Sequence, residues 1–204
     1  MGTTSRKAAG PPKAEDGDRE VALAAPLRLA REVDRLKREL ELARAEVRRL
    51  ETLANEDPLC AVLNRRGFDR ALRQAAAHVA RYGTPAALIA FDLDGFKRVN
   101  DTHGHREGDH VLKAVAAALT QNVRASDLVA RTGGDEFAVL LWHADEANAR
   151  RKAEQLVSLL PIGASFGVVS LGALGADEAV AAADRLMYED KHRRKQAAAH
   201  APRR

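Results

Sequence analysis

An unbroken heptad repeat of apolar residues marks the N-terminal part of the chain. Between residues 29 and 54 the apolar side chains recur in alternating steps of four and three. They are Leu29, Leu36, Ala43 and Leu50 at position d, and Val33, Leu40, Val47 and Ala54 at position a. Valine at a with leucine at d favours a parallel, two-stranded coiled coil. The pattern therefore predicts a dimeric coiled coil over residues 26–56, with the homodimer contact at 29–54.

Charged residues beside this seam support the pairing in part. Two of the three cross-helix pairs that the register creates carry opposite charges, which stabilise a parallel dimer. The pairs are Glu32 with Lys37, Glu39 with Arg44 and, with like charges, Glu46 with Glu51. An amphipathic helix packed on its own domain would show the same apolar stripe. The unbroken register and the complementary charges favour the coiled coil.

Beyond residue 57 the pattern alternates between strand and helix periods. The apolar run from Pro85 to Phe91 predicts a strand buried on both faces. Two short strands around Gly133-Gly134 predict a β-hairpin. The full set is strands at 85–91, 128–131, 136–142 and 164–171, and helices at 67–82, 108–122, 144–160 and 178–192. This order predicts an α/β (α+β) fold, a mixed sheet covered by helices.

Composition adds limits to this picture. With 46% hydrophobic residues the chain can bury a core, and with 4% aromatic residues that core must be packed with small side chains. Residues 1–25 have no apolar period and are expected to be a disordered tail. The single cysteine, Cys60, excludes an intramolecular disulfide and favours the cytoplasm. No apolar run approaches the ~18 residues that a membrane-spanning helix needs, so no membrane segment is expected.

The net charge of +4 suggests nucleic-acid binding until its location is considered. Residues 57–190 hold 15 Lys and Arg against 18 Asp and Glu, whereas residues 191–204 hold six basic residues and no acidic one. The basicity therefore belongs to the C-terminal end of the chain, whose last part, 196–204, is expected to be a basic tail. The body of the domain is slightly acidic, so no nucleic-acid partner is expected.

Four acidic residues lie at the ends of predicted strands. Asp92 and Asp94 end the buried strand, and Asp135 and Glu136 follow the two glycines of the hairpin. If the hairpin lies beside that strand, three or four carboxylates converge on one point, which suits Mg²⁺ or Mn²⁺ beside a phosphate. Lys97 could reach the same phosphate. For Asp94 a helix-capping role is favoured over metal binding.

At this point the motifs resemble a known family. The segment 131–137, Arg-Thr-Gly-Gly-Asp-Glu-Phe, resembles the signature of GGDEF-domain diguanylate cyclases. Further segments match the family in order: Asp57-Pro58-Leu59 with 63–66, the strand-to-helix motif 92–101, Gly104 to Asp109, 165–168, and 183–188 with Lys191. The resemblance covers about residues 57–195, and the set of motifs together is highly specific.

The resemblance implies an enzyme that condenses two GTP molecules into cyclic di-GMP and releases pyrophosphate. The fold would be the palm-like fold of nucleotidyl cyclases. Asp92, the carbonyl of Leu93 and Asp135 would hold Mg²⁺ (or Mn²⁺), two ions per active site, with Glu136 contributing nearby. Asp135 also lies where the family's suggested general base does, so Asp135 and Glu136 are the candidate catalytic residues.

The resemblance also assigns residues to substrate and to regulation. Asn100, Asp109 and His105 would bind guanine, and Lys97, Lys191 and Lys195 would bind phosphates. Lys195 stands where relatives often have arginine, so it keeps the charge but loses the bidentate fork. Arg124 and Asp127 match the Arg-x-x-Asp inhibitory motif, with Arg131 assisting, and imply product inhibition by cyclic di-GMP. A surface salt bridge is the alternative explanation of that motif.

One departure from the family pattern and two other functions remain to be weighed. Cys60-Ala61 replaces the usual Thr-Gly of the opening motif, which alters a turn but no chemistry. A catalytically silent cyclic di-GMP receptor would keep the inhibitory motif without activity, and a purely structural protein would need only the coiled coil. The intact Gly133-Gly134-Asp135-Glu136-Phe137 favours the enzyme over both.

Overall fold

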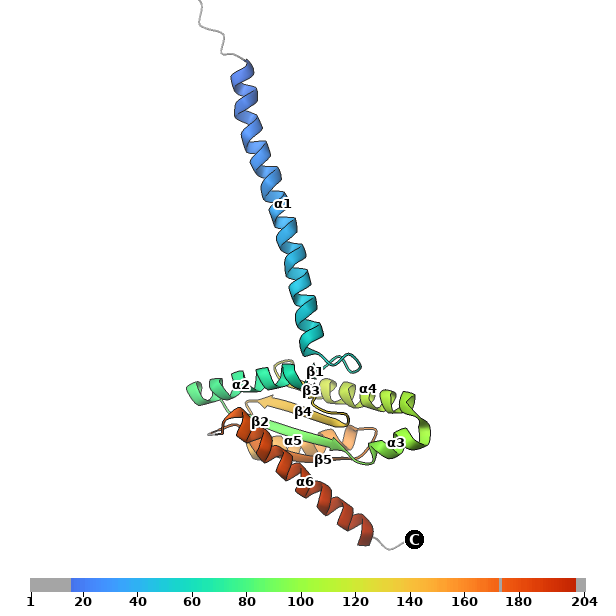
Figure 1. Ribbon diagram of the computed structural model, residues 1–204. Coiled ribbons are helices and arrows are strands. Elements are labelled where there is room, and N and C mark those ends of the chain that lie inside the picture. Colours follow the sequence, from blue (N-terminus) through green and yellow to red (C-terminus); the bar gives the residue numbers. More distant parts are fainter. Residues whose placement is uncertain (1–15, 173, 201–204) are drawn as a thin grey trace, which may run out of the picture. The chain divides into compact units, whose positions relative to one another are not determined.

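The computed structural model describes the backbone of residues 16–172 and 174–200, and the burial of residues 28–172 and 174–196. Two compact units make up the chain, Met1–Leu50 and Glu51–Arg204. The described part of the first unit is helical, and the second unit contains the sheet (Figure 1). Among the helices of the described residues, none has the length and apolar character that crossing a membrane requires.

Helix α1 (Asp16–Asn55) contains the whole predicted heptad segment. It begins at Asp16, so residues 16–25, predicted as part of a disordered tail, are helical; the alanines of this segment have high helix propensity. Residues 1–15 lie outside the described part of the chain. Several heptad side chains are exposed in the single chain, among them Leu29 (65%) and Leu50 (55%). Arg35 pairs with Glu32 and Arg49 with Glu46 along the helix.

The second unit is built on a mixed five-stranded sheet. Its strands are ordered β1-β3-β4-β2-β5. β2 is antiparallel to both β4 and β5, β3 and β4 form the predicted antiparallel hairpin, and β1 is parallel to β3. The strands are β1 (Leu63–Asn64), β2 (Ala86–Leu93), β3 (Leu128–Arg131), β4 (Glu136–Trp142) and β5 (Ala164–Ser170). The α+β fold with helices over a mixed sheet is thus confirmed.

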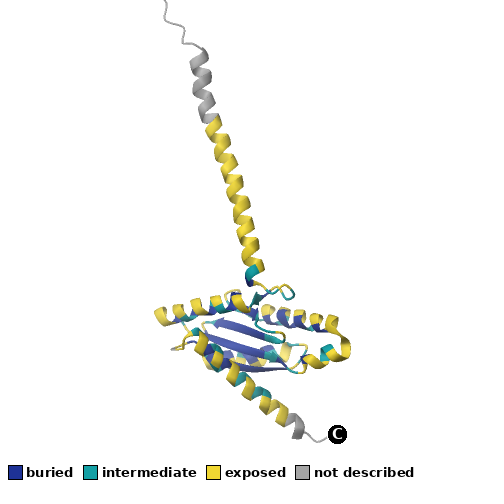
Figure 2. Cartoon of the chain, viewed as in Figure 1, coloured by how far each residue is buried: buried dark blue, intermediate teal, exposed yellow. Residues whose placement is uncertain are grey.

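Helices cover both faces of this sheet, which explains the unbroken apolar run of β2. Leu88 and Ala90 face the cluster formed with α2 (Arg65–Tyr82) and α6 (Ala176–His200). Ile89 and Phe91 face the opposite cluster, formed with α4 (His105–Gln121) and α5 (Glu146–Leu159). Figure 2 shows the strands buried between helices whose outer residues are exposed. Alternate side chains of β2 therefore enter two different cores.

Two short elements were not predicted. β1 has two residues, too few for a periodic signal. α3 (Phe96–His103) lies between Gly95 (φ 74°) and Gly104 (φ 83°), two left-handed positions that glycine adopts without strain. Gly104 separates α3 from α4, which starts at His105 rather than at residue 108.

Gly167 of β5 lets helix α6 approach the sheet closely. A Cβ atom at this position would lie 2.0 Å from the Ala183 carbonyl oxygen and 2.6 Å from the Met187 amide nitrogen. The contact is with helix backbone, which cannot move aside as a flexible side chain could. It fixes the helix that carries Lys191. α6 continues to His200, so 196–200 are helical rather than a tail, while residues 201–204 lie outside the described part of the chain.

Candidate active site

The register of β2 against β4 brings the predicted acidic residues to one end of the sheet. Asp92 lies directly opposite Glu136 in the antiparallel pair. One step further, the Leu93 amide donates a hydrogen bond to the Asp135 carbonyl oxygen at 3.0 Å. The prediction that the hairpin lies beside the buried strand is confirmed.

An open cleft of about 820 Å³ lies at this end of the sheet. It combines acidic and basic side chains from four segments: the end of β2, helix α3, the β3–β4 turn and helix α6. Its lining includes Leu93, Asp94, Lys97, Asp135, Lys191 and Lys195. The backbone position predicted to bind metal and the lysines predicted to bind phosphate therefore face one space.

Lys191 is held by the carboxylates of this cleft. Its Nζ donates a hydrogen bond to Asp92 Oδ1. Burial lowers the pKa of Lys191, but the hydrogen bond and charge of Asp92, with the charges of Asp135 and Asp94, raise it by more, so the net shift is upward. Three carboxylates thus act on a single cation. Such hard oxygen donors fit Mg²⁺ or Mn²⁺.

The expected convergence of three or four carboxylates into a ready metal cluster is not found. Within the described ranges, no three Asp, Glu, His or Cys side chains are grouped so that they could hold a metal ion. Asp92 is paired with Lys191, and Glu136 lines a different groove from Asp135. The reason is the alternation of side chains, which sends consecutive residues to opposite faces as the strand begins.

Asp94 is not the helix cap that the sequence favoured. The N-cap of α3 is Gly95, and no side chain caps the helix. Asp94 instead accepts a hydrogen bond from the buried Ser165 hydroxyl at 2.9 Å, and its amide donates to the Gly163 carbonyl oxygen at 2.7 Å. Because β5 holds it in this way, Asp94 faces the cleft as an additional acidic residue.

The candidate guanine-binding residues lie where α3 meets α4. Asn100 is on the same face of α3 as Lys97, one turn further along. Its side chain packs against Gly108, where a Cβ atom would lie 1.9 Å from Asn100 Oδ1. Asp109 is the next residue of α4, and His105 begins that helix; both are exposed. Gly108 therefore allows the close helix contact that brings Asn100 beside Asp109.

Comparison with known proteins identifies the family to which this fold belongs. The family model "Diguanylate cyclase, GGDEF domain" matches residues 54–197. The chain belongs to this family. It is 44% identical over 102 residues to the diguanylate cyclase DosC of Escherichia coli K12, covering 50% of this chain and 22% of DosC. Over 116 residues it is 46% identical to the bifunctional diguanylate cyclase/cyclic di-GMP phosphodiesterase MucR of Pseudomonas aeruginosa, covering 57% of this chain and 17% of MucR. The chain thus spans about a fifth of these relatives.

Solved structures agree with this assignment. The coiled coil and GGDEF domain of DgcB from Caulobacter crescentus, in complex with c-di-GMP, superposes with a TM-score of 0.71 at 27% identity, covering 83% of this chain and 95% of that one. A microbial GGDEF domain studied for its interaction with cyclic di-GMP gives a TM-score of 0.66 at 35% identity, covering 70% and 94%. The GGDEF fold therefore lies in the second unit, where the family match covers residues 54–197.

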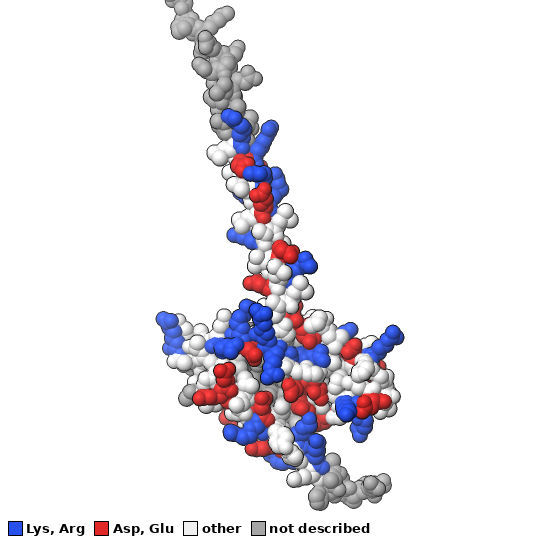
Figure 3. Space-filling model, viewed as in Figure 1, with Lys and Arg blue, Asp and Glu red and all other residues white. Residues whose placement is uncertain are grey.

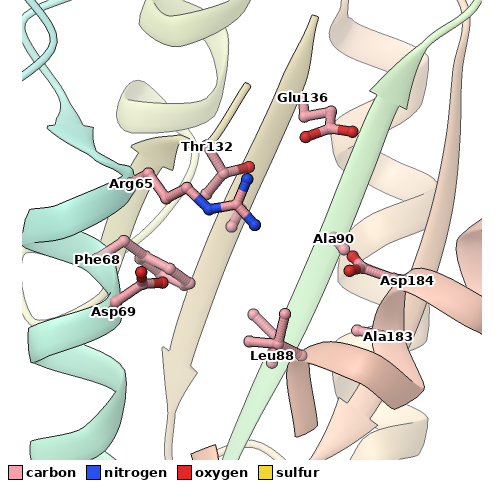
Figure 4. Close-up of a pocket in the computed structure, with 11 residues that line it drawn as sticks. Arg65, Phe68, Asp69, Leu88, Ala90, Thr132, Glu136, Ala183 and Asp184 are labelled. Atoms are coloured by element: carbon pink, nitrogen blue, oxygen red, sulfur yellow. The ribbon is translucent and has the colours of Figure 1, made fainter. Parts of the chain in front are cut away.

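Within the GGDEF motif, Glu136 lines a narrow groove between α2 and α6. Figure 4 shows the guanidinium of Arg65 reaching into this groove toward the side on which Glu136 and Asp184 lie. Glu136 bends over Gly133, where a Cβ atom would lie 2.4 Å from Glu136 Oε2. Burial raises the pKa of Asp184, and the charge of Arg65 opposes that shift. No sequence signal linked Arg65 to Asp184, because they belong to different helices.

Arg131, predicted to assist the inhibitory motif, makes its own contacts with other segments. Its guanidinium donates to the Gly134 carbonyl oxygen at 2.7 and 3.2 Å and to Asp57 Oδ2 at 3.3 Å. It therefore joins the opening motif of the GGDEF domain to the GGDEF turn.

The Arg-x-x-Asp segment forms a turn before β3. Asp127 Oδ2 accepts from the Arg124 amide at 2.9 Å, and Asp127 Oδ1 accepts from the Trp142 amide at 3.0 Å. Arg124 and Asp127 line one pocket, together with Trp142 and Lys152. No Arg124–Asp127 ion pair is formed among the described residues, so the surface salt bridge does not explain the motif. Acidic and basic side chains are interspersed over the face shown in Figure 3.

Proposed function

We propose that this protein condenses two GTP molecules into cyclic di-GMP. The 3′-hydroxyl oxygen of each GTP attacks the α-phosphorus of the other, and two pyrophosphate ions leave. The observation that carries the proposal is the single cleft that combines Asp135, Lys97 and Lys191 within a family match over 54–197. Because GTP is the substrate, we place the reaction in the cytoplasm.

Each cleft residue has a part in this scheme. Lys97, Lys191 and Lys195 would neutralise the β- and γ-phosphates, and Asp135 would accept the proton of the attacking hydroxyl. Asp92, Asp135 and the Leu93 carbonyl would hold Mg²⁺ or Mn²⁺, two ions per site, with Glu136 nearby. The ions would supply charge neutralisation for the phosphate oxygens. Positioning and charge, rather than a covalent intermediate, account for the rate.

Guanine recognition fits the contact of α3 with α4. The Asn100 amide and the Asp109 carboxylate complement the acceptors and donors of the guanine edge, and His105 would line the same pocket. Asn100 and Lys97 share one helix face, so base and phosphates can be held together.

Two domains must meet for the reaction, since each binds one GTP. We propose that the exposed heptad face of α1, over residues 29–54, forms a parallel homodimer and raises the local concentration of one domain around the other. The DgcB relative, whose structure includes a coiled coil, supports this arrangement. We also propose that cyclic di-GMP binds at Arg124 and Asp127 and inhibits the enzyme.

Incubation with GTP and Mg²⁺ tests the activity. Wild-type protein should form cyclic di-GMP, detected by chromatography and mass spectrometry, and Asp135→Asn should lose nearly all of it. The matched control is Asp145→Asn, which changes the exposed N-cap of α5 to another good capping residue and should keep full activity. A wild type that binds cyclic di-GMP but forms none at high protein concentration would instead indicate the silent receptor.

Substitutions in α1 test the dimer. Leu36→Glu with Leu40→Glu places charges in the heptad seam, and both side chains are exposed in the single chain, so the domain should still fold. Sedimentation should show a monomer, and activity per protomer should fall steeply on dilution. Leu42→Glu is the control, since Leu42 is 71% exposed outside the seam. A variant that stays dimeric, or a monomer whose specific activity is independent of concentration, contradicts the role.

A further inference from the structure

Trp142 is the single tryptophan of the chain, and it lies where two surface pockets meet. The first pocket contains Arg124 and Asp127, the candidate inhibitory residues. The second extends from Trp142 toward the outer face of α2 and includes His78 and Ser126. Trp142 lines both. A ligand bound at Arg124 would therefore have to extend past residue 142 into the second pocket to reach the aromatic ring.

Trp142 is fixed by one backbone contact and one ring contact. Its backbone amide donates to Asp127 Oδ1 at 3.0 Å, which ties it to the Arg-x-x-Asp turn. Its ring meets the His78 ring edge to face, with centroids 5.5 Å apart and an interplanar angle of 87°. Because Trp142 is half-buried and packs with the α2-side cluster, the open part of its indole belongs to the second pocket. A fixed, partly exposed indole is a suitable surface for stacking a planar base.

The charges around the first pocket indicate what kind of molecule would bring that base. Arg124 is exposed and offers a fork for guanine acceptors or a phosphate, and Lys152 supplies a second cation to the same pocket. Cations on one side and an aromatic platform on the other suit a nucleotide. A cyclic dinucleotide has two purines, so one can be bound by Arg124 while the other reaches the indole.

We propose that Trp142, supported by His78, is the stacking platform for one purine of a cyclic dinucleotide bound at Arg124 and Asp127. This rests on the inhibitory site of the proposed function and adds the residue that binds the second base. A second copy of the domain covering the same pocket is the competing occupant, and the experiments below separate the two.

Intrinsic fluorescence gives a readout that does not depend on activity. Since Trp142 is the only tryptophan, its emission reports on this place alone. Cyclic di-GMP should quench it in a saturable way at constant protein concentration, and Arg124→Ala should abolish the quenching. GMP, which has one purine, should have a much weaker effect. Emission that changes with protein concentration but not with cyclic di-GMP would favour the second copy and overturn the proposal.

Calorimetric titration with cyclic di-GMP measures the contribution of the ring. Trp142→Leu should weaken binding about tenfold to a hundredfold, and Trp142→Phe, which keeps an aromatic face, should restore most of it. Tyr188→Leu is the control, since Tyr188 is an exposed aromatic residue on α6 that lines a different pocket, and this variant should bind cyclic di-GMP as the wild type does.

Two results distinguish this inference from the site on which it rests. If Arg124→Ala abolishes binding and Trp142→Leu leaves the affinity unchanged, the inhibitory site stands and the stacking platform is wrong. If the wild type does not bind cyclic di-GMP, both fail. Thermal unfolding of each variant checks that it is folded. If Trp142→Leu is unfolded, the test rests on Trp142→Phe, His78→Ala and the quenching of the wild type. We expect His78→Ala to weaken binding severalfold.

Discussion

Arg131 and Asp57 form an ion pair across 74 positions of the chain, with side chains that are only 16% and 15% exposed. The same guanidinium holds the Gly134 carbonyl oxygen at 2.7 Å, directly before Asp135. One side chain therefore joins the segment that follows α1 to the turn that carries a candidate catalytic residue. Nothing in the local sequence around either residue indicated this link.

Removing the Arg131 guanidinium should lower both stability and activity. We expect Arg131→Ala to lose about 2–4 kcal/mol of unfolding free energy, because Asp57 is left as a largely buried, unpaired charge. Arg131→Lys keeps the positive charge but loses the two-pronged guanidinium. Relative to wild type, its stability should therefore fall less than its kcat. Urea unfolding and steady-state kinetics measure the two effects. Arg49→Ala, which breaks an exposed ion pair in α1, should cost less than about 0.5 kcal/mol. Unchanged kcat in Arg131→Ala would contradict the positioning role.

Gly134 should be required by the substrate rather than by the fold. A Cβ atom at Gly134 would meet no protein atom within 4 Å, and its φ is not in the left-handed region. The free energy of unfolding of Gly134→Ala should therefore lie within about 0.5 kcal/mol of the wild-type value. It should nevertheless lose most cyclic di-GMP formation, because the methyl group would occupy space beside Asp135 that the nucleotide needs. Full activity in this variant would show that no ligand approaches the turn closely.

Ala61 adopts a conformation that suits glycine. Its φ is 53°, at the position where the family usually has glycine. A left-handed residue with a Cβ atom costs roughly 1–2 kcal/mol, so Ala61→Gly should raise the free energy of unfolding by about 1 kcal/mol. Ala77→Gly, in the exposed interior of α2, should lower it by a similar amount. Chemical denaturation of both variants should give these opposite signs; equal signs would mean that Ala61 is not strained.

The Cys60 thiol should be unreactive in the folded protein. Burial, followed by the charge of Asp57, raises its pKa from 9.0 to about 11. The native thiol is then ionised roughly 100-fold less than the unfolded one at pH 8, and alkylation should slow accordingly. The folded protein retains the thiol proton to a higher pH than the unfolded protein does, so its stability should fall as pH rises from 9 to about 11. Cys60→Ala should remove that part of the pH dependence. Equal alkylation rates in native and denatured protein would refute this.

The sequence predicted elements with a long, regular period and missed short ones. β3 and β4 have the predicted bounds, and β2 extends two residues beyond its apolar run. α3 was missed because eight residues between two glycines are only about two turns, too short for a helical period to repeat. The predicted disorder of residues 16–25 was wrong because polar composition concealed good helix formers.

For the site, the sequence could predict proximity but not the direction of side chains. The meeting of Asp92 with the hairpin followed from the strand order. The hydrogen bond from Ser165 that turns Asp94 into the cleft depends on β5, 71 positions away. The position of Arg131 likewise depends on Asp57. Such contacts are decided by tertiary packing, which no local pattern contains.

The pairing of β2 with β4 also limits how the chain can change in length. Deleting one residue between Ala86 and Phe91 would shift every later side chain of β2 to the other face. Asp92 would then point into the α4–α5 core, and Phe91 would lose its place there. Insertions and deletions in natural variants of this domain should therefore be confined to connecting loops such as 161–163, between α5 and β5. Both paired strands should keep a constant length.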